Sequence, residues 1–292
     1  MKKYLLFCVG LIVSLMPTSC ASQSSRSGQT ETDTIAMVLE PVSFPSQVSE
    51  IVEPEGYERV QIDDTTSFAY YLRHLPLKPK GTPVRYYNGE ISGLNELAYA
   101  VIDGFDTGTE DIQQCADAII RLRAEWLYKH QRYDDIAFHF TNGWLCDYKH
   151  WAEGYRVAVK GNHTSWYQAK SRDYSYKTFR KYLDMVFNYA GTLSLSKELK
   201  PVKLQDMQIG DVFIIGGSPG HAILVIDVAE NPKTGDKSFV VAESYMPAQD
   251  IHILINERHA SISPWYSLKD FMDEGACNFP TYWYSTDCLK RF

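Results

Sequence analysis

The sequence predicts an α+β fold in which one long helix packs on an antiparallel β-meander. Two observations predict this class. Apolar residues recur at helical spacing within residues 110–126, and from residue 209 onward short apolar runs alternate with turn residues. A helix that precedes consecutive antiparallel strands is typical of the α+β class.

The amino terminus has the pattern of an export signal. A basic start is followed by an apolar stretch over residues 5–16 and by small residues that lead to Cys20. The stretch is too short for a comfortable membrane span. It resembles a bacterial lipoprotein signal, so we expect residues 1–19 to be cleaved and Cys20 to carry a lipid that binds the membrane. A cleaved secreted protein without lipid is the alternative, because Pro17 stands where leucine is usual.

Residues 20–50 are rich in serine, glutamine and proline, which predicts a flexible tether. Residues 51–292 are expected to form a single α+β domain. The formal net charge is −7, and removal of the two lysines in the signal changes it to −9. An acidic protein without a cluster of lysine and arginine argues against nucleic acid as a partner.

The elements of this domain follow from local patterns. Residues 66–77 indicate a short helix and residues 82–91 a hairpin. Thr109 is the expected N-cap of the long helix, whose buried stripe comprises Ile112, Cys115, Ile119, Leu122 and Trp126. An irregular aromatic region covers 134–175, and a second helix is expected over Tyr176–Tyr189. The strands of the meander are expected at 211–216, 221–228, 238–244 and 251–255.

The segment GDVFIIGGSPGHAILVID, residues 210–227, places His221 at the start of a strand. Apolar runs on both sides indicate buried strands. The glycines between them allow a turn in which the backbone stays close to the imidazole. We therefore expect one face of His221 to be accessible. The alternative is a histidine that only donates a hydrogen bond to a neighbouring carbonyl.

A cysteine on an early buried helix, followed by a histidine that opens a strand, is the order found in papain-like cysteine hydrolases. Cys115 is the candidate nucleophile and His221 the candidate base. A helix that starts at Glu110 would place Cys115 in its second turn, where the helix dipole gives little help.

The third catalytic member is either Asp227 or Glu243. Asp227 is six residues from His221 on the same strand, too far for contact. If 227 opposes 238, then 221 opposes 244, which brings Glu243 and Ser244 alongside His221. We therefore assign Glu243 to orient the imidazole. Gln113 or Gln114 is the candidate side-chain donor to an oxyanion.

Other interpretations of these residues remain open. Cys115 could be an inert core residue or form a disulfide with Cys146, and Cys277 could pair with Cys288. Three tryptophans are either core residues or residues that stack on sugar rings: Trp144, Trp151 and Trp166. His163 is expected to be a loop histidine. The histidines are scattered, so no metal site and no cofactor is expected.

Several long segments resemble a family of Bacteroidetes lipoproteins that carry a domain of unknown function. These segments are LRHLPLKP, QQCADAIIRLRAEWLY, GDVFIIGGSPGHAILVID, ESYMPAQDIHIL and SPWY. The resemblance implies an envelope location and a single domain, and no activity. A looser likeness, carried by GD, an apolar run and GHA, is to the NlpC/P60 and amidase-type branch of papain-like enzymes. The chain departs from that pattern in its long interval between Cys115 and His221.

We therefore expect a cell-envelope lipoprotein, facing the periplasm or on the outer-membrane surface, with a papain-like arrangement of helix and meander. Its expected activity is that of a cysteine-type amidase or peptidase acting on a cell-wall peptide through Cys115, His221 and Glu243. The alternative is a non-catalytic lipoprotein that binds a glycan or protein partner through aromatic residues. That alternative predicts an exposed aromatic groove and a buried or disulfide-bonded Cys115.

Overall fold

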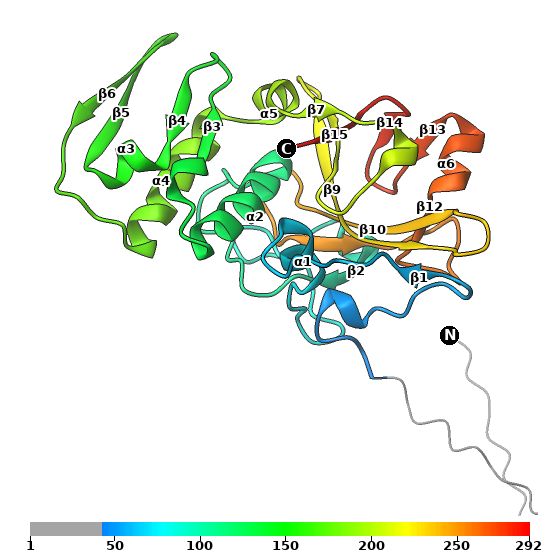
Figure 1. Ribbon diagram of the computed structural model, residues 1–292. Helices are drawn as coiled ribbons and strands as arrows, with labels where there is room; N and C mark the ends of the chain where they lie inside the picture. The colour runs from blue at the N-terminus through cyan, green and yellow to red at the C-terminus, as the bar shows by residue number, and fades with distance from the viewer. Residues whose placement is uncertain (1–42) are drawn as a thin grey trace, which may run out of the picture. The chain divides into compact units, whose positions relative to one another are not determined.

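A nine-stranded antiparallel sheet forms the centre of the structure (Figure 1). The computed structural model describes residues 43–292, and the expected signal peptide, Cys20 and most of the expected tether lie outside the described residues. Ser43–Phe292 form one compact unit. The structure is mixed α and β, with six α-helices in the described part of the chain.

The helices are α1 (Phe68–Arg73), α2 (Cys115–Lys129), α3 (Tyr148–Ala152), α4 (Tyr176–Tyr189), α5 (Thr192–Glu198) and α6 (Leu268–Glu274). The strands of the large sheet are β1 (Glu58–Arg59), β2 (Ala98–Val101), β7 (Lys200–Pro201), β8 (Val212–Ile215), β9 (His221–Glu230), β10 (Lys237–Glu243), β11 (His252–Leu254), β12 (Tyr266–Ser267) and β15 (Leu289–Arg291). Three two-stranded hairpins are formed by β3 (Ala137–His139) with β4 (Leu145–Asp147), β5 (Tyr155–Lys160) with β6 (His163–Gln168), and β13 (Ala276–Asn278) with β14 (Trp283–Ser285). No helix among residues 43–292 has the length and apolar character that a membrane span requires.

The expected meander is present as β8, β9, β10 and β11, which are consecutive neighbours in the sheet. The expected register was wrong, because Val240 and not Ser238 lies opposite Asp227. Two features explain the difference. The strands continue to the pair Glu230 and Lys237, and a bulge at position 226 shifts the register by one residue.

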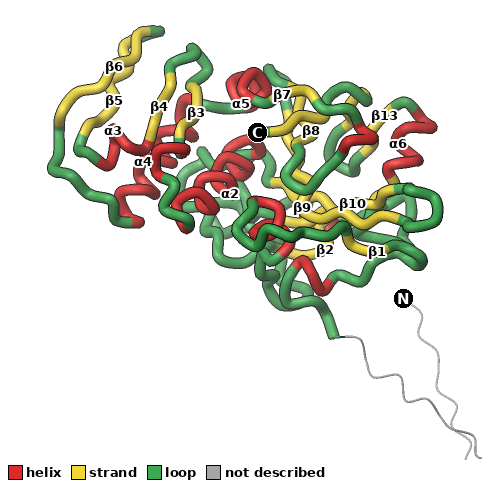
Figure 2. The backbone as a smooth tube through the Cα atoms, in the orientation of Figure 1, coloured by secondary structure: helices red, strands yellow, loops and turns green. Residues whose placement is uncertain are grey.

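Both faces of the meander are buried, so its strands are almost continuously apolar. Figure 2 shows the backbone of these strands in yellow. Alternate residues of β9 contribute to two separate hydrophobic clusters. Leu224 belongs to the cluster beneath α2, whereas Ile223 belongs to the cluster beside α6. The sheet is therefore a middle layer, with α2 on one face and α6 on the other.

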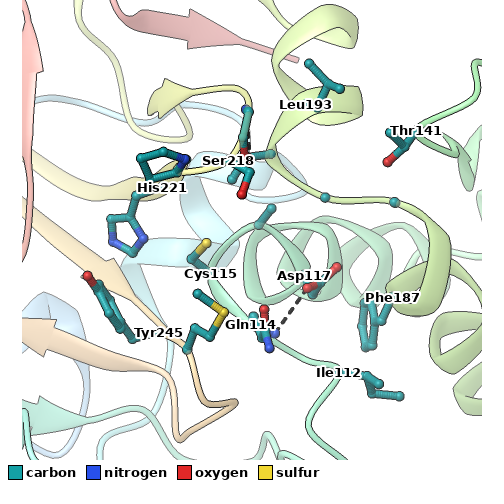
Figure 3. Close-up of a pocket in the computed structure, with 18 of the residues that line it drawn as sticks. Ile112, Gln114, Cys115, Asp117, Thr141, Phe187, Leu193, Ser218, His221 and Tyr245 are labelled. Carbon is teal, nitrogen blue, oxygen red and sulfur yellow. Dashed lines mark hydrogen bonds between the residues drawn. The ribbon is translucent and has the colours of Figure 1, made fainter.

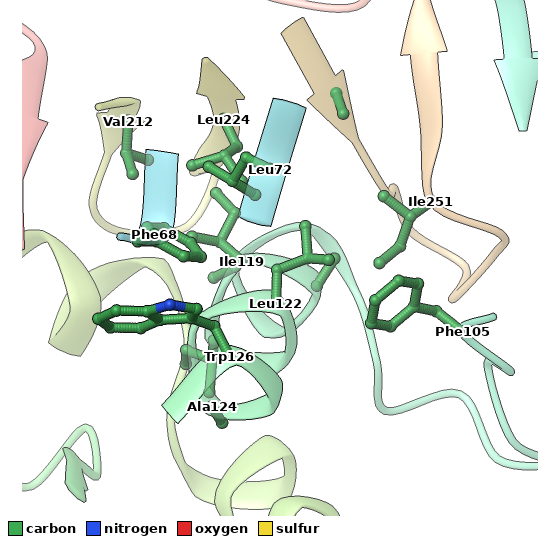
Figure 4. Packing of buried hydrophobic residues seen from close by; sticks show 14 of the residues in the cluster. Phe68, Leu72, Phe105, Ile119, Leu122, Ala124, Trp126, Val212, Leu224 and Ile251 are labelled. Atoms are coloured by element: carbon green, nitrogen blue, oxygen red, sulfur yellow. The ribbon is translucent and has the colours of Figure 1, made fainter. Parts of the chain in front are cut away.

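The helix α2 packs on this sheet through the expected apolar stripe. Ile119, Leu122 and Trp126 are buried against residues of α1 and the meander (Figure 4). The expected start of the helix was wrong. Residues 110–114 are not helical, Gln114 is the N-cap, and Cys115 is the first helical residue. Thr109 therefore does not cap α2.

The aromatic region at 134–175 is more regular than expected. It contains β3, β4, α3, β5 and β6, and with α4 it forms a lobe at the far end of α2, on the left in Figure 1. Helix α4 has the expected bounds. Stacked and edge-on rings fill this lobe, for example Tyr128 on Phe179 with ring centroids 4.3 Å apart. The chain then returns through α5 to β8.

Asp227 forms ion pairs that connect elements of the fold, and it does not contact His221. Its fully buried carboxylate accepts hydrogen bonds from Arg59 Nε and Arg73 Nε, each at 2.7 Å. These two ion pairs join β1 and α1 to β9. Asp227 is therefore not the partner of His221.

We expect Asp227→Asn to lower the free energy of unfolding by about 3–5 kcal/mol, because it removes the carboxylate that pairs with Arg73 and one of the two carboxylates that pair with Arg59. Urea unfolding followed by circular dichroism measures this loss. The reactivity of Cys115 in the folded fraction should be unchanged. A variant of wild-type stability, or one with a selective loss of Cys115 reactivity, would contradict this assignment.

Candidate functional site

Cys115 lies at the amino-terminal end of α2, where its side chain is partly exposed. The N–H groups of a first helical turn have no partner within the helix, and the helix dipole gives this end a partial positive charge. Both effects favour an anion at the Cys115 sulfur. The Cys115 side chain points toward the imidazole of His221 (Figure 3).

The loop before His221 fits closely against α5. A Cβ atom on Gly220 would lie 2.5 Å from Thr192 Oγ1 and 2.6 Å from the Gly217 carbonyl oxygen. Gly216 is similarly close to Ser196. Only glycine fits at these positions, which explains why a glycine-rich segment carries the histidine. The expected placement of His221 as the first residue of a strand is confirmed.

Glu243 holds the imidazole from the side away from Cys115. His221 Nε2 lies 2.7 Å from Glu243 Oε2, and Thr281 Oγ1 donates to the same oxygen at 2.9 Å. Only 3% of His221 and 1% of Glu243 are exposed. Because Nε2 is engaged by the carboxylate, Nδ1 is the ring nitrogen left for the thiol.

The observed register explains this contact. Ala242 pairs with Leu224, so Glu243 is opposite Ile223, two residues from His221 and on the same face of the sheet. Diagonal neighbours of this kind are within reach of long side chains. Ser244, the other expected neighbour, instead donates to the Gln249 carbonyl oxygen at 2.8 Å.

The surroundings favour a protonated imidazole. Burial alone would lower the pKa of His221, but hydrogen bonding to Cys115 and to Glu243 outweighs burial and raises the pKa to about 9. The rings of Tyr245 and Tyr282 lie 4.8 and 5.1 Å from the imidazole, measured between centroids. At neutral pH the site therefore favours a cationic His221 beside Cys115.

A cleft of about 650 Å³ opens over Cys115 and His221. The start of α2, the loop 217–220 and Tyr245 form one part of its lining. The other part is contributed by Thr141 and by residues 187–193, which belong to the lobe and to the start of α5. None of the described residues that line the cleft is lysine or arginine, and Asp111 contributes an acidic side chain to the lining. Asp117 also lines the cleft, but burial raises the pKa of its carboxyl well above the ordinary value.

The two glutamines before Cys115 have different positions. Gln114 lines the cleft, and its Nε2 donates to the Asp111 carboxylate at 3.0 Å. Gln113 is buried, and its Oε1 accepts a hydrogen bond from Arg121 Nη1 at 3.0 Å. Of the two candidate oxyanion donors, only Gln114 is therefore beside the cleft.

The two disulfides that the sequence left open are not formed, since Cys115, Cys146, Cys277 and Cys288 are all free. Burial raises the pKa of the Cys146 thiol well above its ordinary value and that of Cys277 to about 12. Burial also raises the pKa of Cys288. Cys115 is the one partly exposed cysteine among residues 43–292.

The tryptophans considered for sugar stacking do not share one exposed surface. Trp151 is buried, and its indole N–H donates to the Thr178 carbonyl oxygen at 3.1 Å. Trp144 and Trp166 pack against each other with ring centroids 4.9 Å apart, and both are partly buried. His163 is exposed at the start of β6, away from the cleft residues. Within the described chain, no group of three or more metal-ligating side chains is assembled.

His252 and Thr281, which both lie near Glu243, were not among the site residues predicted from the sequence. His252 is directly opposite Glu243 in the pairing of β10 with β11. Alternation along the strand expected at 251–255 assigns His252 to one face of the sheet but does not identify Glu243 as its neighbour. Thr281 belongs to a loop, for which no comparable periodic signal exists.

A family model described as a domain of unknown function, DUF4846, matches residues 48–291. The chain belongs to this family. The expected membership of a family with a domain of unknown function is thereby confirmed, and the DUF4846 domain includes every residue of the site. No curated protein and no solved structure matches the chain.

We expect iodoacetamide at pH 7 to label Cys115 in the native DUF4846 domain and to spare Cys146, Cys277 and Cys288. The reason is that these three thiols are buried and have raised pKa values. Peptide mapping by mass spectrometry locates the label. Labelling in urea should reach all four positions and serves as the control. Native labelling of Cys146 at the rate of Cys115 would contradict the expectation.

Proposed function

We propose that this protein is a thiol hydrolase of the cell envelope that cleaves an amide bond. The observation that supports the proposal most directly is the alignment of three groups, two of which line one cleft while the third lies buried behind them. Cys115 at a helix start faces His221, and Glu243 Oε2 holds the other side of that imidazole at 2.7 Å. A nucleophile, a base and a group that orients the base are the parts that nucleophilic acyl transfer requires.

In the first half of the proposed reaction, the Cys115 thiolate attacks the carbonyl carbon of the amide. The carbonyl π electrons move to oxygen, and the oxyanion lies near the backbone N–H of Cys115 and the Gln114 side chain. The protonated His221 then gives its Nδ1 proton to the amide nitrogen. The C–N bond breaks, the amine leaves, and a thioester on Cys115 remains.

In the second half, water attacks the thioester carbonyl while the neutral His221 accepts a proton from it. The C–S bond breaks, which releases the carboxylic acid and restores the thiolate beside the imidazolium. Glu243 keeps the ring oriented in both halves, since its carboxylate stays on Nε2. The reaction consumes one water for each amide bond and needs no cofactor.

The arrangement of the three groups supports a papain-like site. The nucleophile begins a helix, that helix covers an antiparallel sheet, and the base and its orienting residue lie on neighbouring strands of the sheet. Convergent sites of this type are recognised by geometry and by roles. The order of Cys115, His221 and Glu243 along the chain is also the order in papain-like enzymes.

A cell-wall peptide is the proposed substrate, because the pattern of the amino terminus supports an envelope location for the protein. Residues 1–19 have the pattern of a lipoprotein signal, and a lipid on Cys20 would hold the domain at a membrane next to the wall. The Asp111 side chain in the lining and the lack of lysine and arginine among the described lining residues favour neutral or cationic groups of the substrate.

The direct test is digestion of purified peptidoglycan and soluble muropeptides. We expect the wild-type protein to release new amines and carboxylates, detected by mass spectrometry, and Cys115→Ala and His221→Ala to lose at least about a hundredfold in rate. Cys288→Ala, at a buried free cysteine, is the matched control. No cleavage of any muropeptide by wild type, together with slow labelling of Cys115, would exclude the proposed activity.

The pH dependence should show the proton that His221 gives to the leaving amine. We expect amide hydrolysis to fall as pH rises through about 9, because His221 then loses this proton. The Glu243→Gln variant should show the same fall at a pH lower by about 1 unit, since the carboxylate helps to raise the pKa of His221.

A p-nitrophenyl ester provides the control for this profile, since its leaving group departs without a proton. Its hydrolysis should lack the fall near pH 9. Equal profiles for ester and amide would contradict the role of His221 as the acid.

A further inference from the structure

Glu243 has a second oxygen whose surroundings the proposed reaction does not explain. Oε2 is engaged by His221 and Thr281, whereas Oε1 is buried and has no hydrogen-bond partner among the described residues. The nearest basic atom given by the structure is His252 Nε2, at 3.8 Å from Oε1. That nitrogen is also buried and without a partner in the described chain.

The other nitrogen of His252 identifies its tautomer. His252 Nδ1 lies 3.0 Å from the backbone carbonyl oxygen of Asp250. A carbonyl oxygen can only accept a hydrogen bond, so Nδ1 carries a proton. In a neutral imidazole Nε2 would then be a bare acceptor that faces a carboxylate oxygen. Two acceptors directed at each other in a dry interior are unfavourable.

A proton on His252 Nε2 removes this conflict. The imidazole becomes a donor and a cation opposite Oε1, and a small movement of either side chain closes the gap of 3.8 Å. The four groups then alternate in charge: thiolate of Cys115, imidazolium of His221, carboxylate of Glu243 and imidazolium of His252. The set is neutral overall, whereas a neutral His252 would leave one net negative charge in the interior.

We propose that His252 is a positioning residue for the Cys115 and His221 pair, which acts by holding Oε1 of Glu243 through a proton on Nε2. With both carboxylate oxygens held, Oε2 stays on His221 and the imidazole keeps its orientation toward the thiol. This inference rests on the proposed function. It assigns His252 no contact with substrate, because the residue is fully buried and does not line the cleft.

The other titratable groups near Glu243 do not provide this contact. The Tyr266 hydroxyl donates to the Ile255 carbonyl oxygen. The Asp250 carboxylate accepts hydrogen bonds from Lys78 Nζ and from the Arg85 backbone N–H. Besides His221, the phenols influenced by the charge of Glu243 are those of Tyr245, Tyr266 and Tyr284.

The first test uses the reactivity of Cys115, which requires no knowledge of the substrate. Iodoacetamide labelling is followed from pH 5 to pH 10 in the full-length protein and in His252→Gln. The glutamine amide can approach Oε1 but carries no charge. We expect labelling at pH 6 to be about tenfold slower in His252→Gln, with the difference disappearing at high pH where the thiolate forms without help.

Two further variants separate the possible outcomes. Tyr284→Phe removes another buried hydroxyl beside Glu243 and should label like wild type. His221→Ala should lose fast labelling at pH 6 entirely. If His221→Ala loses it and His252→Gln does not, the role of His252 is overturned and the proposed function stands. If His221→Ala labels like wild type, the proposed function itself is overturned.

A second measurement remains available if His252→Gln does not fold. The ¹⁵N chemical shifts of the His252 ring in the wild-type protein distinguish a protonated from a bare nitrogen. We expect both Nδ1 and Nε2 to carry protons at pH 7. A bare Nε2 at pH 7, or an effect of Tyr284→Phe as large as that of His252→Gln, would overturn the proposal.

Discussion

The position at which α2 begins depends on one hydrogen bond in its first turn. The Asp117 carboxylate accepts from the backbone N–H of Gln114 at 3.1 Å, and this contact closes the first turn one residue before Cys115. A start one turn earlier would rotate Cys115 into the interior of the helix and remove the free N–H groups beside it. The sheet orients His221 and Glu243 independently, so the site exists only because the helix begins at this residue.

The sheet positions His221 and Glu243 through the pairing of two neighbouring strands. His221 and Glu243 lie at adjoining ends of β9 and β10, where the backbone leaves the sheet toward the cleft. The apolar stretches of β9 and β10 behind these two residues are buried on both faces of the sheet. A buried charge pair at this edge is tolerable because Thr281 and the ring of Tyr245 complete its surroundings.

The sequence allowed the contact of His221 with Glu243 to be predicted, although the register behind that prediction was wrong. The bulge at position 226 puts Glu243 on the face of His221, because without its shift of one residue Ser244 would lie opposite Ile223. The bounds of α4 were predictable from its polar and apolar spacing. The start of α2 could not be predicted in the same way. The apolar spacing of the helix continues back to Ile112, so the pattern does not show that the N-cap is Gln114. His252 was out of reach because its importance depends on a partner across the sheet and on the course of the loop at 244–251.

Two separate parts of the chain line the cleft. Cys115 and His221 belong to the helix and the sheet, whereas Thr141, residues 187–188 and residues 190–193 come from the lobe between α2 and β8 and from the start of α5. The residues proposed to react and the residues that form the other wall of the cleft therefore belong to separate segments of the sequence. Substitutions in the lobe can change which molecules enter the cleft while Cys115 and His221 keep their geometry. Members of the family can therefore differ in the molecules that they admit and still keep the same pair of residues.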